Sequence, residues 1–230
     1  MTAPIEEIAE ACPAEELLDH LLGGETGRCA ITCSFQAEDM VVLDLLRRRL
    51  PAIPVLFLDT GYHFHETYEY RDRMSAAWKL NLVNLAPAMT VAEQENSFGI
   101  LHRTDPSRCC HLRKVKPLME ALESFDLWFT GLRREQSPTR RNLKKIEQHA
   151  LPSGRSLLKI NLLADWRWAQ VAEYMSARGI EFLPLYAQGY PSIGCEPCTD
   201  RPADPGDPRS GRWSGQKLEC GIHTFSRQVK

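Results

Sequence analysis

Five of the chain's eight cysteines stand at spacings that suit metal binding or catalysis. Cys109 and Cys110 are adjacent in RCCHLRK, and Cys195 and Cys198 form a CxxC in GCEPC. A CxxC has three interpretations: a zinc site, an iron–sulfur cluster or a dithiol redox pair. Two adjacent thiolates project in divergent directions and chelate one tetrahedral zinc ion poorly. The separate iron corners of a cubane cluster accommodate them better, so the spacing favours a cluster and leaves the other two interpretations open.

Cys220, in KLECGIH, is the fifth of these cysteines and has no partner in the pattern. An odd thiol is a candidate nucleophile if nearby positive charge lowers its pKa. His223, Arg209 and Arg212 can supply that charge, and Gly221 lets the backbone bend. The alternative is a harmless terminal cysteine, although exposed free thiols are usually avoided. The remaining cysteines are expected to be small buried side chains: Cys12, Cys29 and Cys33.

The elements that must position these residues alternate between strand and helix. Strands are expected at 29–34, 53–59 and 81–86, with helices at 36–50 and 63–80 between them. This order with short connections predicts an α/β fold, a mostly parallel sheet flanked by helices. Further elements are expected as follows: a helix at 13–24, strands at 126–132 and 157–163, and a helix at 166–179 that Asp165 caps and Gly179 ends.

Two loops that follow predicted strands suit a nucleotide. SFQAED, residues 34–39, leads from a strand into a helix, whose first N–H groups suit an anion. Asp59, Thr60 and Gly61 follow the next strand and are expected to face the same crevice, because parallel strands place their carboxyl ends together. Neither loop is a Walker motif, and a serine or threonine after a strand is usually only a helix cap.

Arginines follow a later strand in TGLRREQSPTRR, and two more stand in RSGRW. Guanidinium forks bind phosphate or sulfate oxygens with paired hydrogen bonds, while the alternative is a solvated basic surface. These arginines are Arg133, Arg134, Arg140, Arg141, Arg209 and Arg212.

The composition sets further expectations. The chain has 230 residues, a net charge of −2 and a pI of about 6.4, so there is no bulk basic signal for nucleic acid. No stretch approaches the roughly 20 apolar residues of a membrane span, and the first residues lack a signal-peptide pattern. We therefore expect a cytoplasmic protein with no membrane partner. A single domain is expected over 1–230, with a core at about 25–185 and an irregular segment at 186–230 that folds over a site.

Seven motifs together resemble the assimilatory adenylyl-sulfate (APS) reductases, relatives of the 3′-phosphoadenylyl-sulfate (PAPS) reductases. They run in family order from about residue 29 to residue 223: SFQAED, LDTG, CCHLRK, TGLRREQSPTR, SIGCEPC, RSGRW and ECGIH. PAPS-using relatives generally lack the two cysteine pairs. One departure is His65, where relatives often have proline before Glu-Thr. The resemblance implies an adenine nucleotide α-hydrolase-like fold, related to the PP-loop proteins, and a [4Fe–4S] cluster.

The resemblance also implies roles for particular residues. Cys109, Cys110, Cys195 and Cys198 would hold the cluster, and Cys220 would be the nucleophile. His223 would lie beside the reacting sulfate. The phosphosulfate would be held by four cations: Lys114, Arg140, Arg209 and Arg212. SFQAED would help to bind the nucleotide, with the candidate residues Ser34, Phe35, Gln36, Glu38 and Asp39.

The implied reaction is reduction of APS to sulfite and AMP through a Cys S-sulfonate. The reductant would be thioredoxin or a glutaredoxin-like protein. A PAPS reductase is the nearest alternative, but it would need an extra cation for the 3′-phosphate. An iron–sulfur tRNA-thiolating enzyme would want an SGGxDS-type loop and a basic RNA surface. A zinc-stabilised binding module would leave Cys220 without a role. The sequence leaves the oligomeric state open, a homo-oligomer included.

Overall fold

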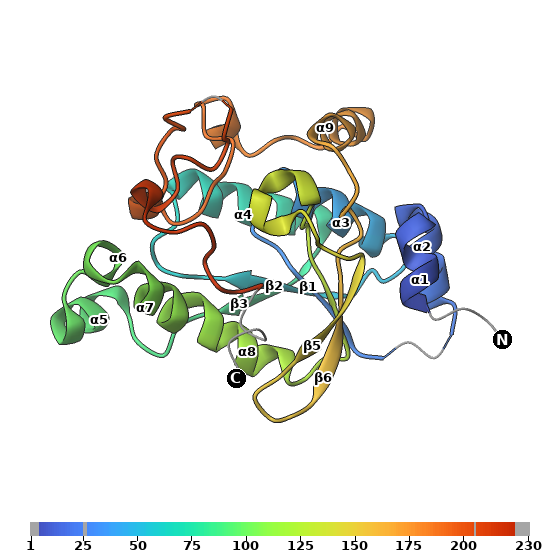
Figure 1. Ribbon diagram of the computed structural model, residues 1–230, viewed down its shortest axis with the longest axis horizontal. Coiled ribbons are helices and arrows are strands. Elements are labelled where there is room, and N and C mark those ends of the chain that lie inside the picture. The colour runs from blue at the N-terminus through green and yellow to red at the C-terminus, as the bar shows by residue number, and fades with distance from the viewer. Residues whose placement is uncertain (1–4, 25–26, 205, 224–230) are drawn as a thin grey trace.

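A six-stranded sheet forms the centre of the protein, here seen in a computed structural model that describes residues 5–24, 27–204 and 206–223 (Figure 1). The strand order is β3-β2-β1-β4-β6-β5. All neighbouring strands pair in parallel except β5 and β6, which are antiparallel. The strands are β1 (Cys29–Thr32), β2 (Pro54–Leu58), β3 (Asn81–Leu85), β4 (Leu127–Phe129), β5 (Ile146–Ala150) and β6 (Ser156–Ile160).

Helices cover both faces of this sheet (Figure 1). The helix α3 packs against one face, where α9 lies over it, and α8 covers the other face. The α-helices are α1 (Ile5–Ala11), α2 (Ala14–Leu22), α3 (Ala37–Arg47), α4 (His65–Trp78), α5 (Val91–Phe98), α6 (Leu101–Thr104), α7 (Pro106–Cys110), α8 (Lys116–Leu122) and α9 (Trp168–Ala177). A π-helical turn, His111–Val115, joins α7 to α8.

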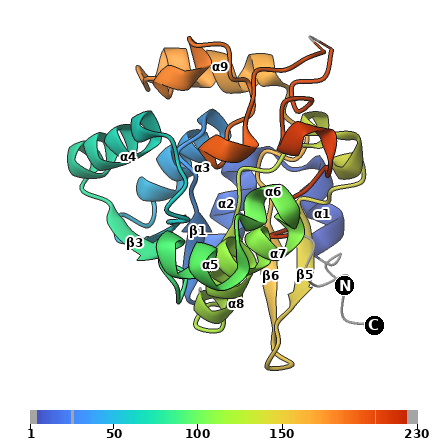
Figure 2. The ribbon, with the colours of Figure 1, turned by 90° about the vertical axis from the view of Figure 1, so that its left-hand side faces the viewer.

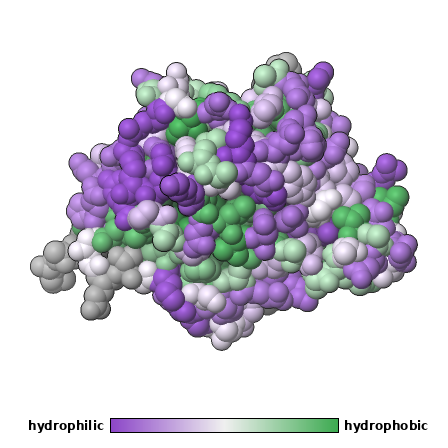
Figure 3. All heavy atoms as spheres, turned by 180° about the vertical axis from the view of Figure 1, so that it is seen from behind, coloured by the Kyte–Doolittle hydropathy of each residue, from purple (hydrophilic) through white to green (hydrophobic). Residues whose placement is uncertain are grey.

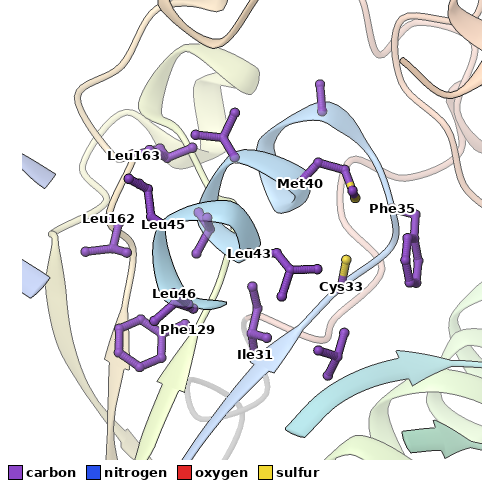
Figure 4. Packing of buried hydrophobic residues seen from close by; sticks show 14 of the residues in the cluster. Ile31, Cys33, Phe35, Met40, Leu43, Leu45, Leu46, Phe129, Leu162 and Leu163 are labelled. Carbon is purple, nitrogen blue, oxygen red and sulfur yellow. The ribbon is translucent and has the colours of Figure 1, made fainter. Parts of the chain in front are cut away.

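The strands divide their side chains between two apolar clusters because successive residues of a strand point to opposite faces. Ile31 and Phe129 belong to the larger cluster with α3, which Figure 4 shows from close by. Ala30 and Trp128 belong to the smaller cluster beside α8. A parallel sheet buried on both faces needs apolar residues at consecutive positions, and the central strands have them.

The predicted strand and helix order of the first half is confirmed, with elements one or a few residues shorter than expected. The prediction that Asp165 caps a helix is wrong. The helix α9 begins later, with Arg167 at the N-cap position, and the Asp165 carboxylate pairs with Lys145 at 2.8 Å. The sequence analysis also missed β5 and the helices from α5 to α8.

The π-helical turn has a local cause in Pro117. Proline lacks an N–H group, and its ring clashes with the carbonyl four residues earlier, here that of Arg113. A wider turn just before it relieves this clash, and such turns are common at functional sites. Lys114 lies in this turn.

The strand order reverses at β1, which lies between β2 and β4. In open α/β sheets this switch point leaves a crevice at the carboxyl ends of the strands. Figure 2 shows α9 and the segment that follows it above these strand ends. The irregular segment predicted to start near residue 186 therefore lies over the crevice. A short helical turn at Pro184–Tyr186 leads into it, and it contains further turns at Glu196–Cys198 and Trp213–Gly215.

The surface is mostly hydrophilic, with apolar atoms in separate patches on the face shown in Figure 3. The large apolar side chains that stay exposed come from different elements: Ile8, Val83, Phe98, Ile100, Trp168 and Leu218. Within the described part of the chain, no helix has the length and apolar character needed to cross a membrane.

Leu43, which is fully buried between α3 and the sheet, provides a test of this packing (Figure 4). Leu43→Ala is expected to lower the free energy of unfolding by about 2–5 kcal/mol, because it leaves a cavity that the core only partly fills. Chemical denaturation measures this change. Ile100→Ala, at a side chain 41% exposed, is the matched control and should cost less than about 1 kcal/mol. Equal losses in the two variants would contradict the described core.

Candidate active site

A cleft of about 590 Å³ lies at the switch point of the sheet. This volume is within the usual range for small-molecule sites. Residues that follow β1, β2 and β4 form one side of it, and the irregular segment forms the other. All but one of the predicted substrate-binding residues line this cleft, together with Cys220. They are Ser34, Gln36, Glu38, Asp39, Lys114, Arg140, Arg209, Arg212 and His223.

The SFQAED loop is held by its own polar side chains. The backbone N–H and Oγ of Ser34 both donate to the Asp39 carboxylate at 2.6 Å. Gln36 donates from Nε2 to Ser34 Oγ and accepts from the backbone N–H of Ile193, which belongs to the irregular segment. The loop is thereby shaped before any ligand binds, and it is tied to the segment that faces it.

Phe35 is the predicted substrate residue that the structure does not bring to the cleft. Its φ is +60°, and its side chain is fully buried against Phe57 and Tyr70. The left-handed backbone turns this ring into the core (Figure 4). Phe35 therefore anchors the loop, and only its backbone remains available to a ligand.

Asp39 connects the ends of β1 and β4. Burial raises the pKa of its carboxyl to about 6, although hydrogen bonds from Ser34 and the backbone of Gly131 oppose the rise. A Cβ on Gly131 would lie 2.3 Å from Asp39 Oδ1. Gly131 therefore allows the backbone after β4 to approach this carboxyl closely.

A buried ion pair that the sequence analysis missed crosses the same region. Arg133 donates to Glu38 from Nε at 3.0 Å and from NH2 at 2.7 Å. Both side chains are at most 10% exposed, and Arg133 also pairs with Glu135. Arg133 is thus neither a solvated arginine nor a free cation, because two carboxylates of the protein already neutralise it.

The expectation that Asp59, Thr60 and Gly61 face the crevice is wrong. After β2 the cleft is lined by Leu58 and His63. Thr60 is buried, and its Oγ1 lies 3.3 Å from Cys195 Sγ. The loop therefore contributes to the surroundings of the cysteines.

The four paired cysteines converge on one small cavity behind the cleft. Cys109 and Cys110 reach it from the end of α7, and Cys195 and Cys198 reach it from the irregular segment. Burial raises the pKa of Cys109 to about 11 and of Cys198 to about 12, and the neighbouring cysteines add to both shifts. Apposed thiols of this kind favour a bound cation, because a cation lets them ionise.

The donor set of this cavity fits a thiolate-bound iron–sulfur cluster, which takes one soft sulfur ligand per iron. Among the residues that the structure describes, no three or more His, Cys, Asp or Glu side chains are grouped to hold one metal ion.

Cations separate the thiol cavity from the cleft. Lys114 lines both spaces. Burial would lower its pKa, but the neighbouring sulfur groups of Cys195, Cys220 and Cys110 raise it above its ordinary value. Arg212 also lines both spaces, and its guanidinium stacks on the Trp213 ring at 4.4 Å. These two groups remain positively charged at the point where the two spaces meet.

Two further cations bind a carboxylate of the protein. Arg140 donates to Glu219 from Nε at 2.9 Å and from NH2 at 2.7 Å. Arg209 lies 3.6 Å from the same carboxylate and donates to the carbonyl of Leu218. Burial, together with the charge of Arg140, lowers the pKa of Arg209 to about 10, so it stays protonated at neutral pH.

Cys220 follows Glu219 directly and lines the cleft. It packs against the small cluster that contains Cys110, Cys198 and Trp213. His223 stacks on the Trp128 ring with a centroid distance of 5.5 Å, and burial lowers its pKa well below the ordinary value. The expectation that His223 supplies positive charge to Cys220 is therefore wrong, because the ring is neutral at physiological pH.

Comparison with known proteins identifies the fold and the family. The model of the phosphoadenosine phosphosulfate reductase domain matches residues 28–201. The chain belongs to this reductase family. An adenosine 5′-phosphosulfate reductase from Mycolicibacterium smegmatis is 44% identical over 222 residues, which cover 94% of this chain and 90% of that protein.

Solved structures agree with the nucleotide-binding fold of the reductase family. A phosphoadenylyl-sulfate (PAPS) reductase from Candida auris, in a phosphate complex, superposes with a TM-score of 0.69 at 24% identity, covering 85% of this chain and 97% of that one. An FMN adenylyltransferase from Candida glabrata, with FMN and an ATP analogue, gives a TM-score of 0.58 at 16% identity, covering 88% and 69%. The predicted α/β fold of the PP-loop-related type is confirmed.

The raised pKa of Asp39 makes a prediction about stability. The carboxyl binds its proton more tightly in the folded chain, at a pKa of about 6 against the ordinary value of 3.8 for an aspartate. Raising the pH through this window therefore destabilises the wild type relative to Asp39→Asn, by about 2–3 kcal/mol in total. Chemical denaturation of both proteins at pH 4.5 and pH 7 measures the change. A difference that stays constant across this range would contradict the assignment.

Proposed function

We propose that this enzyme reduces adenosine 5′-phosphosulfate to sulfite and AMP in sulfate assimilation. The observation that carries the proposal is the position of Cys220, which lines a nucleotide-sized cleft together with Lys114 and Arg212. The 44% identity to a protein named adenosine 5′-phosphosulfate reductase supports this substrate. The PAPS reductase at 24% identity supports the fold alone. The two cysteine pairs also favour the APS-using type.

The adenosine would lie in the crevice between the SFQAED loop and the residues after β2 and β4. This placement follows the general rule for ligands of open α/β sheets. The phosphosulfate would extend toward the cations of the irregular segment, Lys114, Arg209 and Arg212, which line the same cleft. Arg140 would contribute only those N–H groups that Glu219 does not take.

In the first step, the Cys220 thiolate attacks the sulfur of the substrate. A bond forms between Sγ and the sulfonate, the bond from sulfur to the bridging oxygen breaks, and AMP leaves with that oxygen. Lys114 and Arg212 stabilise the charge that develops on the leaving phosphate, because buried cations are already oriented toward it.

In the second step, a thiolate of reduced thioredoxin, or of a glutaredoxin-like protein, attacks Sγ of Cys220 and releases sulfite. The second thiol of the reductant then resolves the mixed disulfide and returns Cys220 as a thiol. The two electrons thus come from the dithiol. The segment that carries Cys220 must leave the cleft for this step. All eight cysteines are free, which suits a reducing cytoplasmic compartment.

We also propose that Cys109, Cys110, Cys195 and Cys198 hold a [4Fe–4S] cluster. The convergence of the four thiols on one cavity supports it. When bound, the cluster supplies a fixed charge distribution next to Lys114. The neighbouring chain keeps the ligands in place: Thr60 contacts Cys195, and Arg113 donates to the Thr60 carbonyl. Such surrounding contacts orient the groups that hold a metal.

The nucleophile is tested with Cys220→Ser. The wild type, incubated with APS and no reductant, is expected to gain the mass of one sulfonate on the peptide that carries Cys220. The variant is expected to gain none and to lose turnover, because a serine hydroxyl is a far weaker nucleophile at neutral pH. Mass spectrometry measures the adduct. Cys29→Ser, at a thiol outside the cleft, is the control. An adduct that persists on Cys220→Ser would contradict the assignment of Cys220 as the nucleophile. Faster turnover of PAPS than of APS would contradict the assignment of APS as the substrate.

The cluster is tested by metal analysis of anaerobically purified protein. About four irons and four sulfides per chain are expected, with the visible absorption of thiolate-bound iron. Cys198→Ala is expected to lose most of the iron, whereas Cys29→Ala keeps it. An active wild type that contains zinc in place of iron would contradict the proposal, because iron would then not be the resident metal.

A further inference from the structure

The strongest feature that the proposed chemistry leaves without a role is the carboxylate of Glu219. It receives four contacts at once. Arg140 donates twice, Thr139 Oγ1 donates at 2.8 Å, and Arg209 lies 3.6 Å away. The side chains of Glu219 and Arg140 are only 14% and 13% exposed. A charge-assisted pair with two parallel hydrogen bonds and little solvent is strong and geometrically specific.

This ion pair joins two parts of the chain that are distant in sequence. Arg140 stands in a short helical turn, Pro138–Arg140, in the loop after β4, and Glu219 stands 79 residues later. Burial would raise the pKa of the Glu219 carboxyl, but its contacts with Arg140, Arg209 and Thr139 lower that pKa below the ordinary value. The carboxylate therefore stays ionised. The loop after β4 therefore holds the irregular segment at Glu219, the residue directly before Cys220.

On the other side of Cys220, the chain is held by packing. Ile222 packs against the apolar cluster beside α8, and His223 stacks on Trp128. Gly221, between Cys220 and Ile222, has a φ of +98°, which favours glycine. Consecutive Cα atoms are about 3.8 Å apart, so attachments at residues 219 and 222 leave the thiol of Cys220 little freedom.

The cleft of about 590 Å³ is present while Glu219 is bound to Arg140, and both residues line it. A nucleotide can therefore enter without displacing the carboxylate. Among the described cations of the cleft, Lys114 and Arg212 line the cleft together with Cys220 and also line the cavity of the four paired cysteines. Lys114 and Arg212 thus stay available to a ligand of the cleft, whereas Arg140 is bound to the residue next to Cys220.

We propose that Glu219 is a positioning residue, whose ion pair with Arg140 fixes Cys220 in the cleft for attack on the substrate. This inference rests on the proposed function for the identity of the attack. The positioning itself is a property of the free protein. When the reductant later draws Cys220 out of the cleft, this ion pair must break, so its strength also sets how readily the segment opens.

The first test uses the free protein. Glu219→Gln keeps the size of the side chain but removes the charge. Alkylation of Cys220 by iodoacetamide, followed on its tryptic peptide by mass spectrometry, is expected to accelerate about tenfold or more, because hydrogen bonds to charged groups hold the closed position. The alkylation rate also depends on the charges around the thiol, so tryptic cleavage after Lys217, which reports only on the opening of the segment, is measured in parallel and should accelerate too. Glu120→Gln, at an exposed residue of α8, is the control.

A double variant tests the partner. Glu219→Gln combined with Arg140→Gln should be cleaved no faster than Glu219→Gln alone, because the pair acts as a unit. Wild-type rates of cleavage in Glu219→Gln, or fully additive effects in the double variant, would overturn the proposal. Thermal unfolding of each variant checks that the fold is retained. If Glu219→Gln does not fold, Glu219→Asp replaces it. The shorter side chain should also accelerate cleavage, and wild-type cleavage would overturn the proposal.

The second test separates positioning from competition with the substrate. With APS, Glu219→Gln is expected to lower kcat roughly tenfold to a hundredfold, since a misplaced nucleophile reacts slowly, with KM changed less than about threefold. A lower KM with an unchanged kcat would mean that Glu219 competes with the anionic substrate, which would overturn the proposal. If the wild type reduces no APS, the proposed function fails, whereas the cleavage and alkylation rates still decide the role of Glu219.

Discussion

The parallel pairing of β1 with both β2 and β4 is the constraint on which the site depends. Three strands that run in one direction bring their carboxyl ends to one edge. The chain must then cross from that edge through helices on opposite faces, which leaves a crevice between the loops. Ser34 and Gly131 stand in the two loops that border it. The irregular segment lies over this edge and brings Arg209, Arg212 and Cys220 to the crevice.

Only some of the cations around the crevice are available to bind an anion, because carboxylates of the protein neutralise the others. Arg133 is neutralised by Glu38 and Glu135, and Arg140 by Glu219. Lys114 and Arg212 instead lie beside the sulfur atoms of the paired cysteines. Burial of a cation without a close carboxylate costs free energy of folding unless an anion binds next to it. The free-energy cost of these two groups is therefore consistent with a site whose natural occupant is anionic.

Short runs of consecutive apolar residues predicted the central strands between their helices, because local pattern and tertiary burial agree there. The two cysteine pairs were found by spacing alone. The ion pair between Arg133 and Glu38 was not predictable, since its partners are 95 residues apart. Asp165 looked like a helix cap for the same reason, because its real partner, Lys145, is brought to it only by the fold. The strand β5 is short and half polar, so it gave no strand signal.

The continuous helix formed by α7, the π-helical turn and α8 carries both Cys109 and Cys110 and, one turn later, Lys114. A helix is stiff along its axis, and α8 is embedded in the apolar cluster beneath the sheet. A displacement of the Cys109 and Cys110 sulfur atoms is therefore expected to move the Lys114 ammonium group, because the three residues stand on the same helix. A chemical change at Cys109 or Cys110 would in this way reach a cation of the neighbouring cleft through the backbone of one helix.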